Sequence, residues 1–262
     1  LAGTDIRQWN PSGTVPTSCR FYLVPSNSLL WTINLSRSDG CYEYTGRAID
    51  PGVTAWATPT ATGFQLVKGK DYSLVLSNNV NVGTARYVVK ELTSGAHENS
   101  GSFTITAAPL SKVAAATLAQ QTYTGKAVQP KPKLSFNGMT LSEGTDYTLA
   151  YQDNTKVGTA TVTIAGKGNY RGSKTLSFKI APKGTNISKL TGASKSLTVV
   201  WKKQATQTTG YQIQYSTSSS FKSGNKTVTV GKPGTTSKKI SQLKAKKTYY
   251  VRVRTYKKIG GT

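Results

Sequence analysis

Few residues in this chain could carry out chemistry. It has one histidine, His97, two cysteines, Cys19 and Cys41, and ten carboxylates in 262 residues. His97 lies in the loop-like segment GAHENSG, and the carboxylates lie mostly in turn sequences without the pairing that glycoside hydrolysis needs. No GxSxG, HExxH, GxGxxG or Walker pattern is present. The sequence therefore predicts no catalytic residue, metal site or cofactor, and it predicts that His97 is a solvated loop residue.

The two cysteines favour a structural bond over redox or metal chemistry. Cys19 and Cys41 are separated by 21 residues, which is neither a redox CxxC pair nor a zinc site by itself. A disulfide between them would close a short loop and stabilise the fold by about 3 kcal/mol. The alternative is that both are buried free thiols.

The segments that must position these residues have the patterning of strands. Thr, Ser, Gly, Val and Tyr occur in short alternating stretches, and no long window keeps a 3.6-residue apolar period. Hydrophobic residues make up 36% and charged residues 17%, which is typical of a globular chain, so we expect an all-β fold. No apolar run approaches the roughly 20 residues that cross a bilayer, and the opening LAGTDIRQWN lacks a signal pattern. We expect a soluble piece of something larger, without a membrane span.

One stretch of sequence occurs twice. YTGRAIDPGVTAWATP (44 to 59) is followed 79 positions later by YTGKAVQPKPKLSFNG. Further on, GKDYSLVLSNNVNVGTARYVV (69 to 89) aligns with GTDYTLAYQDNTKVGTATVTI at an offset of 75. The first copy therefore holds four extra residues near TPTATG, and such insertions concentrate in surface loops. The pattern predicts two homologous strand-rich modules, at about 41 to 107 and 119 to 181.

Four polar residues recur at equivalent places in the two copies. Asp71 and Asp146 stand in the DY dipeptides, and Asn79 and Asn154 precede Val-Gly-Thr-Ala. Asp and Asn make turns through side-chain hydrogen bonds to the backbone. This favours turn chemistry over a metal or catalytic role for all four.

Trp56 is where the copies differ most. In the second copy, Leu134 and Phe136 should face the core, leaving Ser135 in solvent. Trp56 aligns with Ser135, which predicts a large aromatic on the outer face, where aromatics supply contact area at low entropic cost. The size argument favours a second interpretation, in which Trp56 packs under residues 1 to 40, which are too few to fold alone. The candidate ligand-binding residues of this first module are Trp56, Thr58, Thr60, Thr62 and His97.

The formal net charge of +24 is concentrated at the C-terminal end. Residues 183 to 262 carry seventeen Lys or Arg and no acid, whereas residues 41 to 107 carry five of each sign. A basic surface of this kind suits an anionic polymer. The expected anion-contacting face consists of Lys238, Lys239, Lys246, Lys247, Arg252 and Arg254. Nucleic acid is a less favoured anion, and a merely solvated outer strand face is the alternative.

The C-terminal segment has its own pattern. Leu197, Val199 and Trp201 alternate on one strand, YQIQY follows, and Leu243 stands six residues before Tyr249. These features resemble a fibronectin type III domain with its tyrosine corner, over nearly all of 183 to 262. Tyr250, Arg252, Arg254 and Tyr256 should then face outward. Because the sequence stops at KKIGGT, we expect an unpaired edge beside residues 249 to 256 and a last strand that is trimmed or disordered.

The repeats resemble a second family. YTGKAVQP and GTDYTLAYQDNTKVGTATVTIAGKGNYRGSKTLSFKI are similar to the immunoglobulin-like repeats of large secreted or wall-attached proteins of Gram-positive bacteria. The resemblance is weaker for 41 to 107, where TSGAHENSG replaces GKGNYRGSKT. It implies tandem β-sandwiches in an elongated, extracellular arrangement: 1 to 118, 119 to 182 and 183 to 262. The internal Lys to Asn isopeptide bond of some such modules needs a buried trio that no pattern locates here.

Three functions are compatible with these features. The favoured one is an adhesin fragment whose N-terminal module recognises a host protein, such as an immunoglobulin or another secreted glycoprotein, or a glycan. In it the other modules form a stalk, and the basic module lies against anionic cell-wall polymer. The alternatives are passive spacer modules of a secreted or wall-anchored enzyme and, least favoured, an enzyme.

Overall fold

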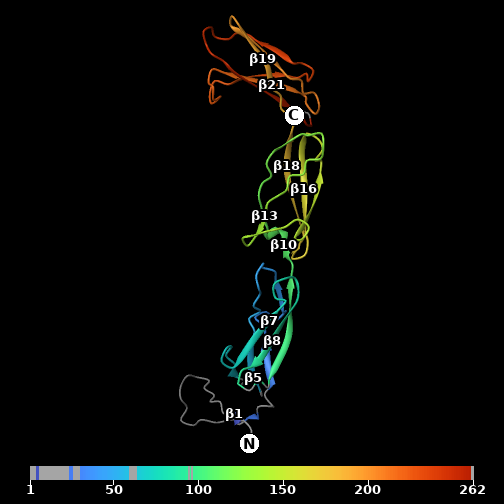
Figure 1. Ribbon diagram of the computed structural model, residues 1–262, viewed down its shortest axis with the longest axis vertical. Helices are drawn as coiled ribbons and strands as arrows, with labels where there is room; N and C mark the ends of the chain where they lie inside the picture. Colours follow the sequence, from blue (N-terminus) through green and yellow to red (C-terminus); the bar gives the residue numbers. More distant parts are fainter. Residues whose placement is uncertain are drawn as a thin grey trace. The chain divides into compact units, whose positions relative to one another are not determined.

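The protein is built from strands throughout the part that the structure describes, as the sequence predicted. The computed structural model describes residues 4–5, 24–25, 30–58, 64–93, 95 and 97–260. These residues contain no α-helix, and a single turn of 3-10 helix, η2 (Leu110–Lys112), joins short strands (Figure 1). No helix among them is long and apolar enough to cross a membrane.

Residues 30 to 106 form two sheets. The three-stranded sheet has the order β3 (Leu30–Asn34), β5 (Thr54–Thr58), β6 (Phe64–Gln65). The four-stranded sheet has the order β4 (Cys41–Glu43), β9 (Glu98–Thr106), β8 (Gly83–Glu91), β7 (Tyr72–Ser77). Nearer the N-terminus, β1 (Thr4–Asp5) pairs with β2 (Val24–Pro25). The sheet that contains β3 therefore begins upstream of the repeat that the sequence places at 41 to 107.

Residues 114 to 181 repeat this strand order. The three-stranded sheet runs β11 (Ala114–Ala115), β13 (Leu134–Phe136), β14 (Met139–Thr140). The four-stranded sheet runs β12 (Gln121–Thr122), β18 (Ser173–Ala181), β16 (Gly158–Gly166), β15 (Tyr147–Gln152). In both copies the two strands that are first and last in the chain pair in parallel: β4 with β9, and β12 with β18. Leu134 and Phe136 are buried and Ser135 is exposed, as the alternation predicted.

The recurring polar residues make the same turns in both copies. The carboxylate of Asp71 accepts a hydrogen bond from Val67 N, and that of Asp146 accepts one from Ser142 N, both at 2.8 Å. The equivalent asparagines brace a second connection. Asn79 Nδ2 donates to Ile49 O at 2.9 Å, and Asn154 Nδ2 donates to Val128 O at 3.1 Å. The turn role is confirmed for Asp71 and Asp146, whereas Asn79 and Asn154 bond to carbonyls 30 and 26 positions away and so act as long-range braces.

Asn154→Ala should lower the free energy of unfolding by about 1 to 2 kcal/mol, because Val128 O loses its side-chain donor at a half-buried position. Urea denaturation of the full chain measures this loss. Asn225→Ala is the control, since the Asn225 bond to Phe221 O is exposed, and its cost should stay within about 0.5 kcal/mol. Equal losses in the two variants would show that the brace adds nothing.

The C-terminal segment forms two further three-stranded sheets. One runs β19 (Ile187–Ala193), β20 (Ser196–Trp201), β23 (Ser237–Ile240), and the other β22 (Lys226–Val230), β21 (Gly210–Ser216), β24 (Tyr250–Tyr256). The core between them contains Leu197, Val199, Trp201, Tyr211, Ile213, Ile240 and Leu243. The hydroxyl of Tyr249 accepts a hydrogen bond from Lys244 N at 3.0 Å, which is the geometry of the predicted tyrosine corner.

The edge of β24 and its outward residues follow the sequence pattern closely. Within the described range β21 is the only strand that pairs with β24, so the expected unpaired edge is present. Tyr250, Arg252 and Arg254 are exposed, as predicted. Tyr256 is half-buried and lies on the same face as these three residues, with its hydroxyl end close to Gly231.

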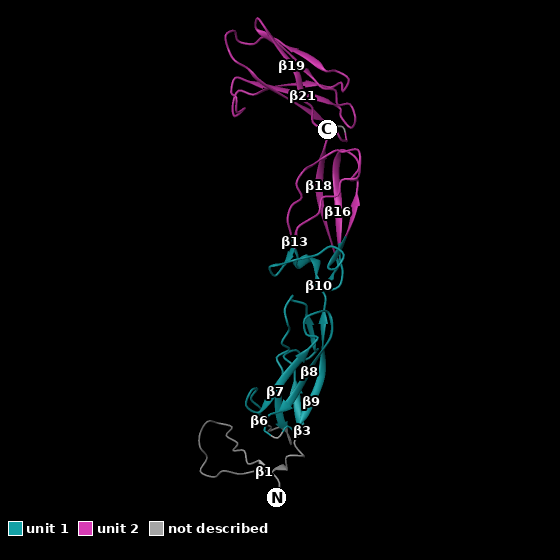
Figure 2. Ribbon diagram, viewed as in Figure 1, with its two compact units in different colours: residues 1–114, 135–148, 165–172 teal, residues 115–134, 149–164, 173–262 magenta. Residues whose placement is uncertain are grey.

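The chain divides into two compact units (Figure 2). Unit 1 is residues 1–114, 135–148 and 165–172; unit 2 is residues 115–134, 149–164 and 173–262. The division passes through β11, β13, β15 and β16 and does not follow the repeat. The domain boundaries near 118 and 182 therefore stay predictions.

Within unit 1, residues of the second copy pack on the first copy through a cluster of three aromatic rings. Tyr170, in β17 (Tyr170–Arg171), meets Tyr44 edge-on at 5.5 Å and Phe136 edge-on at 5.6 Å between ring centroids. Tyr44 stacks on Phe136 at 6.2 Å. Tyr44, Phe136 and Tyr170 are all buried, and we refer to them as the aromatic joint.

Hydrogen bonds from the segment GKGNYRG complete this contact. Asn169 accepts from Val82 N at 2.9 Å and donates to Asn81 Oδ1 at 3.0 Å. The strand β17 also pairs in parallel with β10 (Ala108–Pro109). The first copy replaces this segment with TSGAHENSG, so the sequence difference coincides with a segment that contacts the preceding copy.

Candidate functional site

Trp56 lies on the outer face of β5, as the register predicted. Ala55 and Ala57 on either side are buried in the core, and Trp56 is half-buried. Most of residues 1 to 29 lies outside the described residues, so the packing of Trp56 under residues 1 to 40 stays a prediction, and only the position of β3 can be given. β3 pairs beside β5 in the same sheet, with Thr32 opposite Trp56. On the inward face Trp31 packs against the core, where the small alanines leave room for it.

His97 is not a solvated loop residue, which corrects the expectation from sequence. Its imidazole Nδ1 lies 3.0 Å from Glu91 Oε2, and the two side chains are only 18% and 10% exposed. The ring also stacks on Trp31, with 6.0 Å between centroids and 13° between planes. Loop position alone gave no sign of this, because Trp31 is 66 positions away in the sequence.

The two described members of the predicted ligand-binding group, Trp56 and His97, do not lie on one surface. His97 contacts Trp31, which faces the core, whereas Trp56 faces outward from the neighbouring strand. Thr60, Thr62 and the side chain of Thr58 lie outside the described residues. Trp56 lies on an outer face, which is the placement that the binding hypothesis requires.

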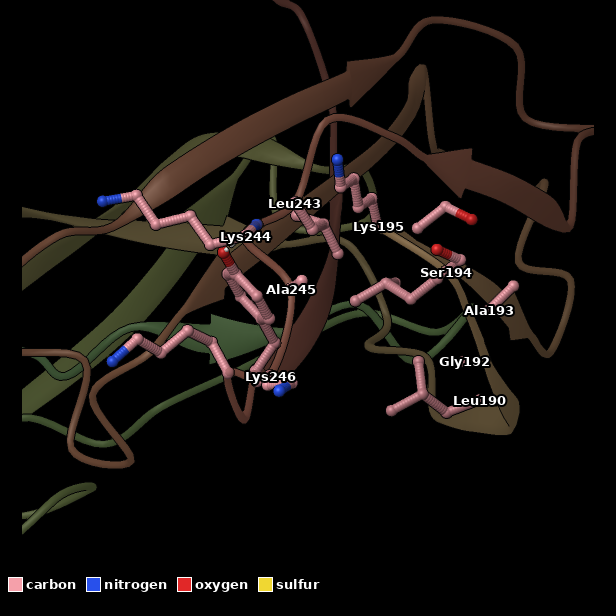
Figure 3. A pocket seen from close by; sticks show the side chains of 13 residues that line it. Leu190, Gly192, Ala193, Ser194, Lys195, Leu243, Lys244, Ala245 and Lys246 are labelled. Atoms are coloured by element: carbon pink, nitrogen blue, oxygen red, sulfur yellow. Dashed lines mark hydrogen bonds between the residues drawn. The ribbon is translucent and has the colours of Figure 1, made fainter.

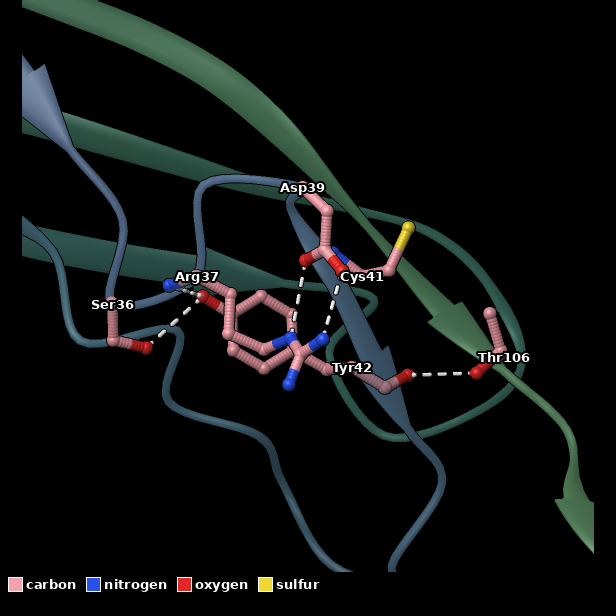
Figure 4. A network of polar contacts seen from close by, with 6 residues as sticks. All are labelled: Ser36, Arg37, Asp39, Cys41, Tyr42 and Thr106. Carbon is pink, nitrogen blue, oxygen red and sulfur yellow. Dashed lines mark hydrogen bonds and ion pairs between the residues drawn. The ribbon is translucent and has the colours of Figure 1, made fainter.

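A polar network surrounds Cys41 (Figure 4). The carboxylate of Asp39 accepts from Arg37 Nη2 at 2.8 Å, from Arg37 Nε at 3.1 Å and from Cys41 N at 3.0 Å. Cys41 is half-buried, and Cys19 lies outside the described residues, so the disulfide stays a prediction. The bond from the Arg37 guanidinium, followed by that from Cys41 N, lowers the pKa of Asp39 to about 2.

This low pKa predicts a pH dependence. Asp39 has a pKa near 3.9 in the unfolded chain, so the ionised form is the one that folding favours. Its contribution to stability is present above about pH 4 and is lost as the pH falls through about 2. Carboxyl chemical shifts measured by NMR should give a pKa of about 2 for Asp39, well below its value in the unfolded chain. Arg37→Gln should remove most of the difference, and an unchanged pKa in that variant would contradict the pairing.

The six predicted anion-contacting residues do not form one face, which is a second correction. Lys238 and Lys239 lie on β23 of one sheet, and Arg252 and Arg254 lie on β24 of the other. Lys246 and Lys247 lie in the connection between β23 and β24. Charge counts carry no information about which sheet a strand joins.

The connection carrying Lys246 borders a hollow of about 470 Å³ at one end of the C-terminal sandwich. Figure 3 shows residues 243 to 246 facing residues 190 to 195 across it. Its basic lining residues are Lys195, Lys244, Lys246 and Lys247, and its apolar walls include Leu197, Leu243 and Tyr249. Lys195 and Lys244 were not singled out from the sequence, because nothing distinguishes them there from other lysines.

A second hollow, of about 400 Å³, lies on the outer face of the sheet β22, β21, β24. Its lining residues are Gln212, Gln214, Thr227, Arg252, Val253 and Arg254. Neither hollow has an acidic lining residue, since residues 183 to 262 contain none. In the described chain no group of three His, Cys, Asp or Glu side chains could hold a metal ion.

Comparison with known proteins identifies the C-terminal module. Residues 181–262 match the model of the fibronectin type III domain. A crystal structure of titin domains is 13% identical, with 88% of this chain and 94% of that chain covered and a TM-score of 0.28. A crystal structure of the chicken CNTN1 FN1-FN3 domains is 16% identical, with 78% and 88% covered and a TM-score of 0.27. No curated protein matches.

Proposed function

We propose that this chain is a non-catalytic fragment of a Gram-positive surface protein, and that its fibronectin type III module binds the phosphate-rich polymer of the cell wall. The observation that carries this proposal is the charge of residues 183 to 262, seventeen Lys or Arg without one Asp or Glu. An uncompensated surface of this kind attracts polyanions and releases their counterions on binding. The immunoglobulin-like copies then serve as spacers, a role that the packed aromatic joint supports.

Purified cell wall, before and after removal of its phosphate polymers, tests the attachment. The full chain should bind untreated wall at low salt, and raising the salt should weaken the binding steeply. Stripped wall should retain little of the chain. Binding that survives both high salt and removal of the polymer would contradict the proposal.

A second candidate function, recognition of a host protein or glycan by the N-terminal module, is favoured by Trp56. An aromatic ring faces outward where the second copy has exposed Ser135, and the residues added in the first copy follow β5 directly. Exposed aromatics at such positions commonly anchor interfaces.

Replacing Trp56 with the residue of the second copy tests this function. Trp56→Ser in the full chain should reduce salt-resistant capture of purified immunoglobulin or mucin by about tenfold, the usual cost of losing an aromatic anchor. Ser135→Ala is the matched control in the second copy and should leave capture unchanged. If neither ligand is captured at high salt by the unaltered chain, the N-terminal module is a spacer like its neighbour.

A further inference from the structure

Two arginines on the fibronectin type III module are held in a repeated geometry. Arg252 lies opposite Gln214 and Arg254 lies opposite Gln212, in alternate rows of the antiparallel pair β21 and β24. Arg252 Nε donates to Gln214 Oε1 at 2.7 Å, and Arg254 Nε donates to Gln212 Oε1 at 2.8 Å. We refer to these four residues as the Arg-Gln ladder.

The ladder fixes each guanidinium without neutralising it. An amide oxygen takes the Nε hydrogen, which leaves the positive charge uncompensated and the Nη donors outside these two bonds. Arg252 is further held over the ring of Phe221, with Cζ 4.4 Å from the ring centroid. Across the described residues, no ion pair engages either arginine. Among the described residues of the module, no hydrogen bond of this kind holds a lysine side chain.

The spacing of the two guanidiniums suits a ligand with repeated charges. Alternate residues of a strand share one face and lie about 7 Å apart. Arg252 and Arg254 therefore present two cations side by side, bordering the hollow of about 400 Å³ that Gln212, Gln214 and Thr227 also line. A guanidinium binds a phosphate through two parallel hydrogen bonds, so two neighbouring arginines can hold two consecutive phosphates.

This face is better suited to binding the phosphates of a polymer chain than to recognising nucleic-acid bases. The amide oxygens that could accept hydrogen bonds from base edges are already used by the arginines. The ring of Phe221, which could stack on a base, is covered by Arg252. The ladder itself leaves its charge and its Nη donors available, which contact phosphates, and the exposed ring of Tyr250 lies two residues from Arg252 on the same face.

We propose that the Arg-Gln ladder is the site on this module that binds two consecutive phosphates of a polyol phosphate chain. This rests on the proposed wall attachment and assigns it to one face of one sheet. The lysines of β23 and of the end hollow then add long-range attraction without fixing the polymer.

A synthetic glycerol phosphate oligomer, titrated into the full chain at two salt concentrations, tests this assignment. Arg252→Gln/Arg254→Gln should lower the affinity about tenfold or more and reduce the salt slope by about 1 to 2, which corresponds to two lost phosphate contacts. Lys238→Gln/Lys239→Gln removes the same charge from the other sheet and should lower affinity less than about threefold.

Two further variants separate geometry from charge. Arg252→Lys/Arg254→Lys keeps the charge but lacks the planar guanidinium that makes two parallel hydrogen bonds. It should therefore lose most of the affinity that the glutamine variant loses. Gln212→Leu/Gln214→Leu keeps both arginines, and it should reduce affinity while leaving the salt slope nearly unchanged. Near-ultraviolet circular dichroism checks that each variant is folded.

The outcomes distinguish the ladder from the wider proposal. Equal losses of affinity in the arginine and the lysine double variants would overturn the ladder as the binding site. Wall attachment through overall charge would be unaffected by that result. No binding of the oligomer by the unaltered chain would overturn both. The unaltered chain could instead bind single-stranded DNA more tightly than the oligomer and lose that binding in the arginine double variant. That result would identify the ligand of the ladder as a nucleic acid and not a polyol phosphate.

Discussion

Replacing Tyr170 with alanine should lower the free energy of unfolding by about 3 to 5 kcal/mol, the range for loss of a large aromatic from a packed site. Tyr170 is 4% exposed and touches both other rings of the aromatic joint. Its removal leaves a cavity beneath Tyr44 and Phe136, which come from different copies of the repeat. Urea denaturation of the full chain, followed by tyrosine and tryptophan fluorescence, measures the change.

Tyr170→Phe is the control, because it keeps the ring and removes only the hydroxyl. It should cost about 1 kcal/mol or less below pH 9. Burial raises the pKa of Tyr170, so its neutral form stabilises the fold, and this contribution is lost as the pH rises above the ordinary value near 10. The phenylalanine variant should therefore lose less stability than the unaltered chain above pH 10. A small effect of the alanine variant would contradict a packed joint.

Replacing Trp201 with alanine should have an effect of similar size on the fibronectin type III module. Trp201 is 2% exposed and lies 5.1 Å from Tyr211 between ring centroids, in the centre of the core. The expected loss is about 3 to 5 kcal/mol, together with loss of the near-ultraviolet signal of this core.

Trp201→Phe should be much milder, at about 1.5 kcal/mol or less. The indole Nε1 is buried and has no hydrogen-bond partner among the described residues, so phenylalanine removes a donor that the core does not satisfy. Because that gain offsets part of the lost volume, the two variants should differ by at least about 2 kcal/mol. Similar losses in both would mean that the indole nitrogen finds a partner in solution.

Period-two alternation let the sequence predict the strands and their inward faces. Leu134 and Phe136, and Ala55 and Ala57 at the equivalent places, are buried because alternate residues of a strand share one face. The repeat also predicted the turn made by Asp146, since a turn depends on residues close together in sequence, but not the bond from Asn154 to Val128 O, which joins residues 26 positions apart.

The parts that could not be predicted depend on long-range pairing. His97 is half-buried because Trp31 stacks on it, and no local pattern reports that contact. The Arg-Gln ladder joins residues about 40 positions apart, so it needs the register of β21 against β24. A signal was nevertheless present: Gln212 and Gln214 repeat with the same spacing as Arg252 and Arg254.

The salt dependence of polymer binding tests the central claim most directly. The affinity of the full chain for a long polyglycerol phosphate should be measured by titration at several concentrations of sodium chloride. We predict that the logarithm of the binding constant falls linearly with the logarithm of the salt concentration, with a slope steeper than about −2 that reflects several phosphate contacts. A flat dependence, or no binding at low salt, would contradict attachment of the fibronectin type III module to the wall polymer.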